Sequence, residues 1–285
     1  MSTVNLFPHD WITIIYLAVS SGLMLIFHKN LARWYLYAAV HVTVILAILS
    51  LHFAPNPLPT VFQLLRDWYA LTTILLFYWE VAPLTRMVFQ KLFDNEIVQW
   101  ENRLFLSQPS TDLSKRFSSI VLSEYLHLCY LSYYAISIAL AATLYFQGKY
   151  EAFYKTLFAE LLTFNVCLIC YIFMPVAGPR YDFEKLKGGL SGGNFFRLTH
   201  AILARASSKG TAFPSSHAAI STIVLLCSAR YDLTSFLILF PFCTGLIIGT
   251  VYGRFHYAID AIAGTLLGIL MFALYPIGYQ WLSGG

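Results

Sequence analysis

The sequence has few charged residues. Asp, Glu, Lys and Arg make up only 11% of its 285 residues, whereas 58% are hydrophobic. Soluble globular domains carry about a quarter charged residues, so this composition excludes an ordinary water-soluble domain. The net charge of +4 is small, and the basic residues form no aromatic-interleaved stripe, so we expect no nucleic acid partner. The expected surroundings are membrane lipids, because a mild positive balance suits anionic headgroups.

Cysteine is also scarce, and all five residues lie inside apolar runs. A disulfide framework needs loops to join, so none is predicted, and the pair Cys167 and Cys170 is interpreted as helix packing. The polar motifs described below have no nearby cluster of carboxylates or histidines that would form a metal cage. We therefore expect neither a metal ion nor another cofactor.

Apolar runs suited to crossing a membrane dominate the sequence. A spanning helix needs about 20 predominantly apolar residues. Eight candidate runs are found, at 11–27, 35–53, 69–89, 122–146, 152–176, 218–229, 234–251 and 260–281. The sixth is short by this measure, but it can extend through Arg230 or start within the preceding loop. The sequence therefore predicts an all-α fold, a polytopic membrane helical bundle of about eight transmembrane helices. It leaves the oligomeric state open.

Two long connections join these runs. Within 90–118, apolar residues recur at helical spacing among charged ones, which predicts a helix lying along the membrane interface. The second connection, 177–216, is a glycine-rich loop and the best candidate for an anion-binding surface, because it holds six of the 18 Lys and Arg residues. These six are Arg180, Lys185, Lys187, Arg197, Arg205 and Lys209.

Three short segments combine residues that suit phosphate chemistry, at 178–180, 213–217 and 254–260. Each lies at the mouth of a predicted span, and an odd number of spans precedes each of the loops that carry them. All three should therefore emerge on the same side of the membrane. We expect them to converge on one pocket.

The segment 213–217, Phe-Pro-Ser-Ser-His, predicts the start of a helix. Proline and small hydroxyl residues suit a helix N-terminus, whose free amides and dipole attract phosphate. Ser215 and Ser216 are therefore candidate phosphate-binding residues. His217 lies at the same helix end and is a candidate general acid, because an imidazole titrates near neutral pH.

His256 and Asp260 are four residues apart at the start of the last run, so we expect them to share one helix face. The carboxylate would then fix the tautomer of the imidazole. An imidazole nitrogen can attack phosphorus in line and form a phosphohistidine, which makes His256 the candidate nucleophile. Arg180 and Arg254 are expected to hold the equatorial phosphate oxygens. Tyr181, the neighbour of Arg180, is assigned to the same phosphate site.

Tyrosines at 130, 133 and 134 recur within the fourth apolar run. We interpret them as helix packing rather than as a slot for lipid.

The three segments resemble motifs of the type 2 phosphatidic acid phosphatase superfamily. Its members are membrane lipid phosphatases and phosphotransferases related to histidine acid phosphatases and vanadium haloperoxidases. The family motif Pro-Ser-x-His is matched by 214–217, with Ser216 where glycine is usual, and His-x-x-x-Asp is matched by His256 and Asp260. The resemblance covers roughly 69–281. It implies a six-helix core with the site outside the cytoplasm.

The chain departs from the family pattern at two of its basic residues. The third motif usually has an arginine six residues before the histidine, where this chain has Thr250, and Arg254 stands closer instead. The first motif usually pairs a lysine with an Arg-Pro, but Phe173 and Tyr181 occupy the lysine and proline positions. Lys209, just before the second motif, is the expected substitute for that lysine. The first and third motifs resemble those of inositol phosphotransferases of sphingolipid synthesis, and the ending His-Tyr-x-x-Asp is similar to that of sphingomyelin synthases.

The sequence and the resemblance together give a division of the chain and a hypothesis for its function. Residues 1–68 form an N-terminal accessory transmembrane hairpin, and 69–285 form a six-helix catalytic core with an interfacial helix near 90–118. The hypothesis is a membrane lipid phosphatase or phosphotransferase that acts on a lipid phosphate or phospho-headgroup through a phosphohistidine, independently of metal. The first alternative is a transferase that passes a phospho-headgroup to a lipid alcohol. The second, a non-catalytic lipid transporter or scramblase, is disfavoured because the polar residues gather at one mouth of the bundle.

Loop charges and the resemblance disagree about orientation. The loops on the motif side hold more Lys and Arg, which by the positive-inside rule would place that side in the cytoplasm. Charges at the site serve phosphate, however, and long loops obey the rule poorly. We therefore follow the resemblance and expect a multi-pass membrane protein whose active site faces the periplasm or lumen.

Overall fold

The computed structural model describes residues 6–53, 58–184, 186–206 and 208–284. All regular secondary structure in these ranges is helical, apart from an isolated β-bridge between Val176 and Thr211. The predicted all-α bundle is thereby confirmed. Lys185, one of the six basic residues of the second connection, lies outside the described residues.

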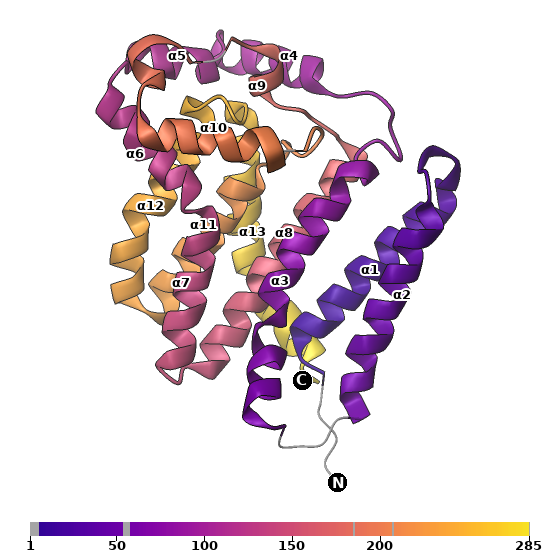
Figure 1. Cartoon of the computed structure of the whole chain (residues 1–285). Coiled ribbons are helices and arrows are strands. Elements are labelled where there is room, and N and C mark those ends of the chain that lie inside the picture. The colour runs from indigo at the N-terminus through magenta and orange to yellow at the C-terminus, as the bar shows by residue number, and fades with distance from the viewer. Residues whose placement is uncertain (1–5, 54–57, 185, 207, 285) are drawn as a thin grey trace.

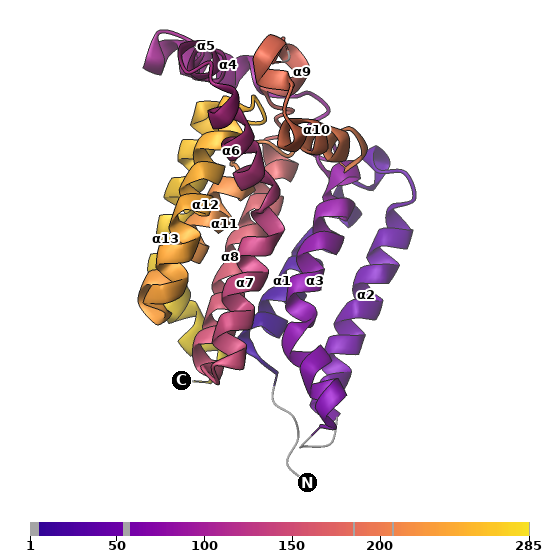
Figure 2. The same ribbon diagram turned by 60° about the vertical axis from the view of Figure 1, so that its left-hand side comes forward.

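Helices that run roughly in one direction form the bundle (Figures 1 and 2). They are α1 (Pro8–Ile26), α2 (Trp34–Ser50), α3 (Thr60–Leu84), α6 (Ile120–Leu131), α7 (Tyr133–Phe146), α8 (Tyr150–Phe173), α11 (Ser216–Tyr231), α12 (Leu233–Tyr252) and α13 (Ala258–Leu282). Helices α6 and α7 are bent by 56° relative to each other and together occupy the fourth predicted run. Each of the eight runs therefore contains a bundle helix.

Four of these helices are long and apolar enough to cross a membrane by length and composition. They are α1, α8, α12 and α13, and the bent pair α6 and α7 makes a fifth if it is one span. Helices α2 and α11 have only 17 and 16 residues, and α3 carries Arg66, Asp67 and Glu80 along its length. The spans expected at α2, α3 and α11 remain predictions.

Short helices form a layer across one end of the bundle (Figure 1). They are α4 (Asp94–Phe105), α5 (Pro109–Arg116), α9 (Pro179–Asp182), the 3-10 turn η3 (Gly188–Ser191) and α10 (Asn194–Ala206). The single interfacial helix expected near 90–118 is thus two helices, because Leu106 takes a left-handed conformation with φ of 57° and ends α4. The start of α1 and the end of α13 lie at the opposite end of the bundle (Figure 1).

Helix α10 corrects the description of 177–216 as a loop. Its amphipathic sequence packs on α6. The carboxylate of Glu124 on α6 accepts hydrogen bonds from the backbone N–H groups of Phe195 and Phe196, at 3.0 and 2.9 Å. A carboxylate at a helix N-terminus satisfies amides that the helix itself leaves unpaired. This contact fixes the start of α10 over the end of the bundle.

Glycines bring α13 close to α11, and this packing positions the site. A Cβ atom at Gly264 would lie 2.2 Å from the carbonyl oxygen of Ser215, and one at Gly268 would lie 2.7 Å from that of Ala219. Only glycine allows such an approach of two helix backbones. The starts of α11 and α13, which follow the second and third motifs, are therefore held side by side.

The N-terminal helices are joined to the rest of the bundle. Helix α1 packs against α2 and α8. Its Asp10 forms a buried ion pair with Arg66 of α3, at 3.0 and 2.5 Å, and Asp67 of α3 accepts hydrogen bonds from Tyr145 and Tyr154 of the core. A division of the chain at residue 68 stays a prediction.

Candidate active site

Three segments distant in sequence meet at the end of the bundle covered by the short helices. Segment 175–180 leads into α9, segment 211–217 into α11, and segment 253–260 joins α12 to α13. The backbone N–H of Ala212 donates to the carbonyl of Val176 at 2.9 Å, and that of Ser215 donates to the carbonyl of Asp260 at 3.0 Å. The expected convergence of the three motifs is therefore found in the structure.

Helix α11 begins at Ser216, as the sequence predicts. Ser215 is its N-cap, and its hydroxyl oxygen accepts a hydrogen bond from the N–H of Ala218 at 3.3 Å. The N–H of Ser216 donates to the hydroxyl oxygen of Tyr171 at 3.2 Å. The Ser215 hydroxyl and the Ser216 amide therefore already have hydrogen-bond partners within the protein. The side chain of Ser216 lines a cavity. His217 lines this cavity and also a smaller pocket beside it, which contains His256.

His256 lies just before α13 rather than on it, which corrects the expected shared helix face. Tyr257 is the N-cap, and Asp260 in the first turn accepts a hydrogen bond from its N–H at 2.9 Å. This cap leaves the Asp260 carboxylate 3.6 Å from Nδ1 of His256. The same Nδ1 lies 3.0 Å from the carbonyl oxygen of Ala212. Because a carbonyl only accepts hydrogen bonds, Nδ1 carries the proton and Nε2 of the neutral ring is the free base.

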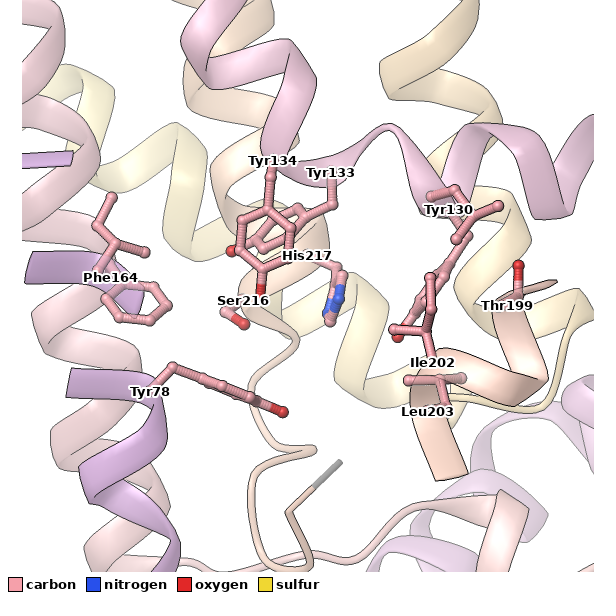
Figure 3. A pocket seen from close by; sticks show the side chains of 12 residues that line it. Tyr78, Tyr130, Tyr133, Tyr134, Phe164, Thr199, Ile202, Leu203, Ser216 and His217 are labelled. Carbon is pink, nitrogen blue, oxygen red and sulfur yellow. The ribbon is translucent and has the colours of Figure 1, made fainter. Parts of the chain in front are cut away.

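The two histidines contact each other inside the site. Nε2 of His256 lies 3.3 Å from Nδ1 of His217. The ring of His217 lies between two tyrosines, with centroids 4.8 Å from Tyr130 and 4.3 Å from Tyr133 (Figure 3). Aromatic neighbours on both sides restrict the orientation of the ring.

A small pocket opens beside the two histidines, and it also contains Arg180 and Tyr181. The guanidinium of Arg180 donates to the carbonyl oxygen of Leu203 on α10 at 3.3 Å and lies 4.9 Å from the centre of the Tyr181 ring. Nζ of Lys209 lies 4.8 Å from the centre of the same ring. Of the expected phosphate-binding cations, Arg180 therefore lines the pocket, whereas Lys209 lies near it only through its contact with the ring of Tyr181.

Arg254 is turned away from this pocket and is not among the residues that line it. Its guanidinium donates to the backbone carbonyl of Glu184 and to the hydroxyl of Ser114, the latter at 3.1 Å. Burial lowers the pKa of the guanidinium below its ordinary value. In this structure Arg254 joins α5 to the loop after α9, so the structure does not bring it to the phosphate site.

An aromatic cavity of about 140 Å³ adjoins the pocket beside the two histidines, which measures about 40 Å³. Tyr78, Tyr130 and His217 line both spaces, and Tyr133 and Tyr134 line the larger one (Figure 3). A third, apolar cavity lies between α3 and α7 and shares Tyr133 and Tyr134 with it. The interpretation of these tyrosines as packing alone is incomplete, because they line cavities beside the polar site.

Two buried carboxylates on α4 were not expected at the site. Asp94 accepts hydrogen bonds from the backbone of the first motif, and Glu101 from the start of α13. Burial raises the pKa of Glu101 to about 7. The amphipathic pattern within 90–118 predicts a helix, but it gives no sign that Asp94 and Glu101 are buried. Within the described ranges, no group of three His, Cys, Asp or Glu side chains could hold a metal ion.

A family model described as the PAP2 superfamily matches residues 95–274, more than half of the chain. The chain therefore belongs to the PAP2 superfamily. The matched range contains all three motifs, and the match supports a phosphatase-like function in general. Helices α1 to α3 precede this range. No curated protein and no solved structure matches the chain.

Proposed function

We propose that this protein is a membrane enzyme that breaks a phosphoester bond of a lipid through a phosphohistidine on His256. The observation that carries the proposal is the 3.3 Å contact between Nε2 of His256 and Nδ1 of His217 in a pocket that also contains Arg180. Membership of the PAP2 superfamily supports the same class of chemistry. In this proposal His256 is the nucleophile, His217 is the general acid and Arg180 binds the phosphate.

In the first step the lone pair on Nε2 of His256 attacks phosphorus, and the bond from phosphorus to the lipid oxygen breaks. A protonated His217 gives its proton to the departing oxygen, which leaves as an alcohol. The phosphorylated imidazole of His256 is cationic, and its Nδ1–H group faces the carbonyl of Ala212 and the carboxylate of Asp260. Arg180 and Lys209 would stabilise the charge on the equatorial oxygens.

The contact between the two rings has a consequence for substrate binding. A gap of 3.3 Å between Nε2 and Nδ1 is too short to hold a phosphorus atom with an oxygen on its far side. The hydrogen bond between His256 and His217 must therefore break when the phosphate enters. We expect the ring of His217 to turn, because His256 is fixed by Ala212 on one side and by the α13 cap on the other.

In the second step an oxygen nucleophile attacks phosphorus and the bond to Nε2 breaks. The neutral His217 takes the proton from that nucleophile, which restores both rings. Water gives a phosphatase, and a lipid alcohol gives a phosphotransferase. The transferase is a second candidate because the cavity beside His217 is lined mainly by tyrosines and aliphatic residues, which suits an alcohol acceptor.

A lipid substrate is supported by the cavities that adjoin the site. The tyrosine-lined cavity shares lining residues with the phosphate pocket on one side and with the apolar cavity between α3 and α7 on the other, so a lipid could extend across the three spaces. Leu75, Ile138 and Ile74 line the apolar cavity. A phosphate at the polar end and a hydrocarbon chain at the apolar end would match this gradient.

We also propose that the site lies at one membrane surface, on the periplasmic or luminal side. Labelling of a Ser191→Cys variant by a membrane-impermeant maleimide tests the sidedness in intact cells or vesicles. Ser191 lies in η3 of the layer that covers the site, and four of the five native cysteines are buried. Labelling only after permeabilisation would place the site in the cytoplasm instead.

The experiment that tests the proposal gives the purified protein a panel of lipid phosphates and phospho-headgroup donors. Free phosphate identifies hydrolysis, and a labelled lipid product identifies transfer. Brief incubation with a ³²P-labelled substrate, followed by alkaline quenching, should trap radioactivity that is stable to base and labile to acid, as expected for phosphohistidine. Retained turnover or retained label in His256→Ala would overturn the assignment of the nucleophile.

A further inference from the structure

The interfacial helix α4 contacts two catalytic segments through carboxylates. Asp94 lies in its first turn and Glu101 lies two turns later, so both fall on the same helix face. That face points into the protein, since Asp94 is 7% exposed and Glu101 is fully buried. Each carboxylate accepts hydrogen bonds from two consecutive backbone N–H groups. Neither residue takes part in the chemistry proposed above.

Asp94 holds the segment that leads to Arg180. The N–H of Ala177 donates to its Oδ2 and the N–H of Gly178 donates to its Oδ1, both at 2.9 Å. Gly178 has a φ of +94°, and a Cβ atom there would lie 2.8 Å from the carbonyl oxygen of Phe255. The segment is therefore fixed between α4 and the third motif. Arg180 follows two residues later, in the single turn of α9.

Glu101 holds the start of α13. The N–H of Ala258 donates to its Oε1 at 2.5 Å, and the N–H of Ile259 donates to the same oxygen at 3.3 Å. These are the first two amides of the helix, which have no partner within it and attract an anion. His256 immediately precedes the N-cap residue of this helix. The direction in which its ring points therefore depends on how the helix start is held.

We propose that Asp94 and Glu101 are positioning residues of the reaction, Asp94 for the phosphate-binding Arg180 and Glu101 for the nucleophilic His256. The assignment rests on the proposed function for the roles of Arg180 and His256. Helix α4 thereby fixes the first motif relative to the third. Tyr257 strengthens this link, because its hydroxyl donates to Oδ1 of Asp94 at 3.3 Å.

The hydrogen-bond geometry predicts opposite results for the two conservative substitutions. Both amides at Glu101 converge on one oxygen, so Glu101→Gln keeps an acceptor for both. The amides at Asp94 use different oxygens, so Asp94→Asn must turn an NH₂ group toward one of the N–H donors. A buried donor left without an acceptor weakens the contact by enough to change an equilibrium about tenfold. Asparagine should therefore fail at 94, whereas glutamine should succeed at 101.

The test compares Asp94→Ala, Asp94→Asn, Glu101→Ala and Glu101→Gln in the full-length protein. Turnover of p-nitrophenyl phosphate gives kcat and KM, and calorimetry gives the affinity for inorganic phosphate. We expect both Asp94 variants to bind phosphate at least about tenfold more weakly with a smaller change in kcat. We expect kcat to fall at least about tenfold in Glu101→Ala, with nearly unchanged phosphate affinity. In Glu101→Gln, kcat should stay close to that of wild type.

Glu96→Gln is the matched control, because Glu96 lies on the same helix but is paired with Lys91 on the surface. Glu96→Gln should leave kcat and the affinity for phosphate unchanged. Equal losses of kcat and phosphate affinity in the Asp94 variants and in Glu101→Ala, or effects of these variants no larger than those of Glu96→Gln, would overturn the proposal. If Asp94→Ala does not fold, Asp94→Asn still tests the role of Asp94; if Glu101→Ala does not fold, Glu101→Leu, which fills the space without an acceptor oxygen, takes its place.

A separate measurement distinguishes failure of this proposal from failure of the proposed function. The rate at which diethyl pyrocarbonate modifies His256 reports the accessibility of its Nε2 without any turnover. A wild-type protein that converts no phosphate ester would refute the proposed function. In that case a changed modification rate in Glu101→Ala, absent in Glu96→Gln, would still support positioning, and an unchanged rate would refute it.

Discussion

Nε2 of His256 lies 3.3 Å from Nδ1 of His217, although the two residues stand at the starts of different helices. The contact depends on the close packing of α13 on α11 and on the hydrogen bond from the Ser215 N–H to the Asp260 carbonyl. The rings are held differently. His256 is bonded to the backbone of Ala212, whereas His217 lies between aromatic rings. Substitutions of the two histidines should therefore have different effects.

His256→Ala should abolish turnover while the protein still folds. Loss of the nucleophile removes the covalent intermediate, and a decrease of at least about 1,000-fold in kcat is expected from comparable enzymes. The side chain lies in a polar pocket rather than in the apolar core, so the melting temperature should change little. Rates and thermal unfolding in detergent measure both quantities. Activity within about tenfold of wild type would contradict the nucleophile role.

His217→Gln should affect substrates according to their leaving groups. A lipid alkoxide needs a proton as it leaves, so loss of the acid should slow the cleavage of a lipid phosphate by about 100-fold to 10,000-fold. p-Nitrophenolate leaves without a proton, so the formation of the phosphoenzyme from p-nitrophenyl phosphate should be much less affected. Single-turnover rates with the two substrates provide the comparison. An equal loss with both would refute the role of general acid.

Much of the fold could be predicted because hydrophobic runs report directly on helices in lipid. Each predicted run contains a helix, and Pro214 and Ser215 correctly indicate the start of α11. The connection 177–216 was harder, because its many glycines concealed the 13-residue amphipathic helix α10. Composition averaged over a long segment hides a short periodic pattern within it.

The site could be predicted only where spacing in the sequence reflects contact in space. The pairing of His256 with Asp260 was predicted correctly, but it arises from an N-cap rather than from a shared helix face. Arg254 was expected at the phosphate site because it lies close to His256 in the sequence, yet its guanidinium bonds to Glu184 and Ser114 instead. Asp94 and Glu101 could not be predicted, because their partners are backbone amides far along the chain.

Substitutions of the two arginines near the motifs should separate binding from stability. Arg180→Lys loses the planar fork that holds two phosphate oxygens, so KM for a phosphate ester should rise by about tenfold or more. Arg254→Gln breaks hydrogen bonds to Glu184 and Ser114, so it should lower the melting temperature with little change in KM. Steady-state kinetics and thermal unfolding test both variants. A large rise in KM for Arg254→Gln alone would reverse the assignment.

The stability of the protein should depend on pH through Glu101. Burial raises the pKa of this carboxyl from 4.5 to about 7, against the opposing effect of the hydrogen bonds from the Ile259 and Ala258 amides, and the charge of Asp260 adds a smaller increase. Between those values the folded protein binds more protons than the unfolded chain, so its stability falls as the pH rises from 4.5 to about 7 and then levels off.

Glu101→Gln removes this titration while keeping the acceptor oxygen. The melting temperature of the variant minus that of wild type should therefore increase from about pH 5 to about pH 8. Glu96→Gln on the same helix should not show this increase, because the hydrogen bond from Lys91 lowers the pKa of Glu96 instead of raising it. Parallel melting curves of wild type and Glu101→Gln across that range would contradict the prediction.

Gly264→Ala should separate α11 from α13 and thereby weaken the histidine pair. The new Cβ would lie 2.2 Å from the carbonyl oxygen of Ser215, a backbone atom that cannot turn away. Overpacking of this kind costs about 1–3 kcal/mol, so the melting temperature should fall by several degrees. Activity should fall further than stability explains, because the displaced segment carries His217. Gly278→Ala, whose Cβ would lie 3.5 Å from the nearest atom of Phe158, should change neither quantity. Equal behaviour of the two alanine variants would show that the approach at Gly264 does not hold the site together.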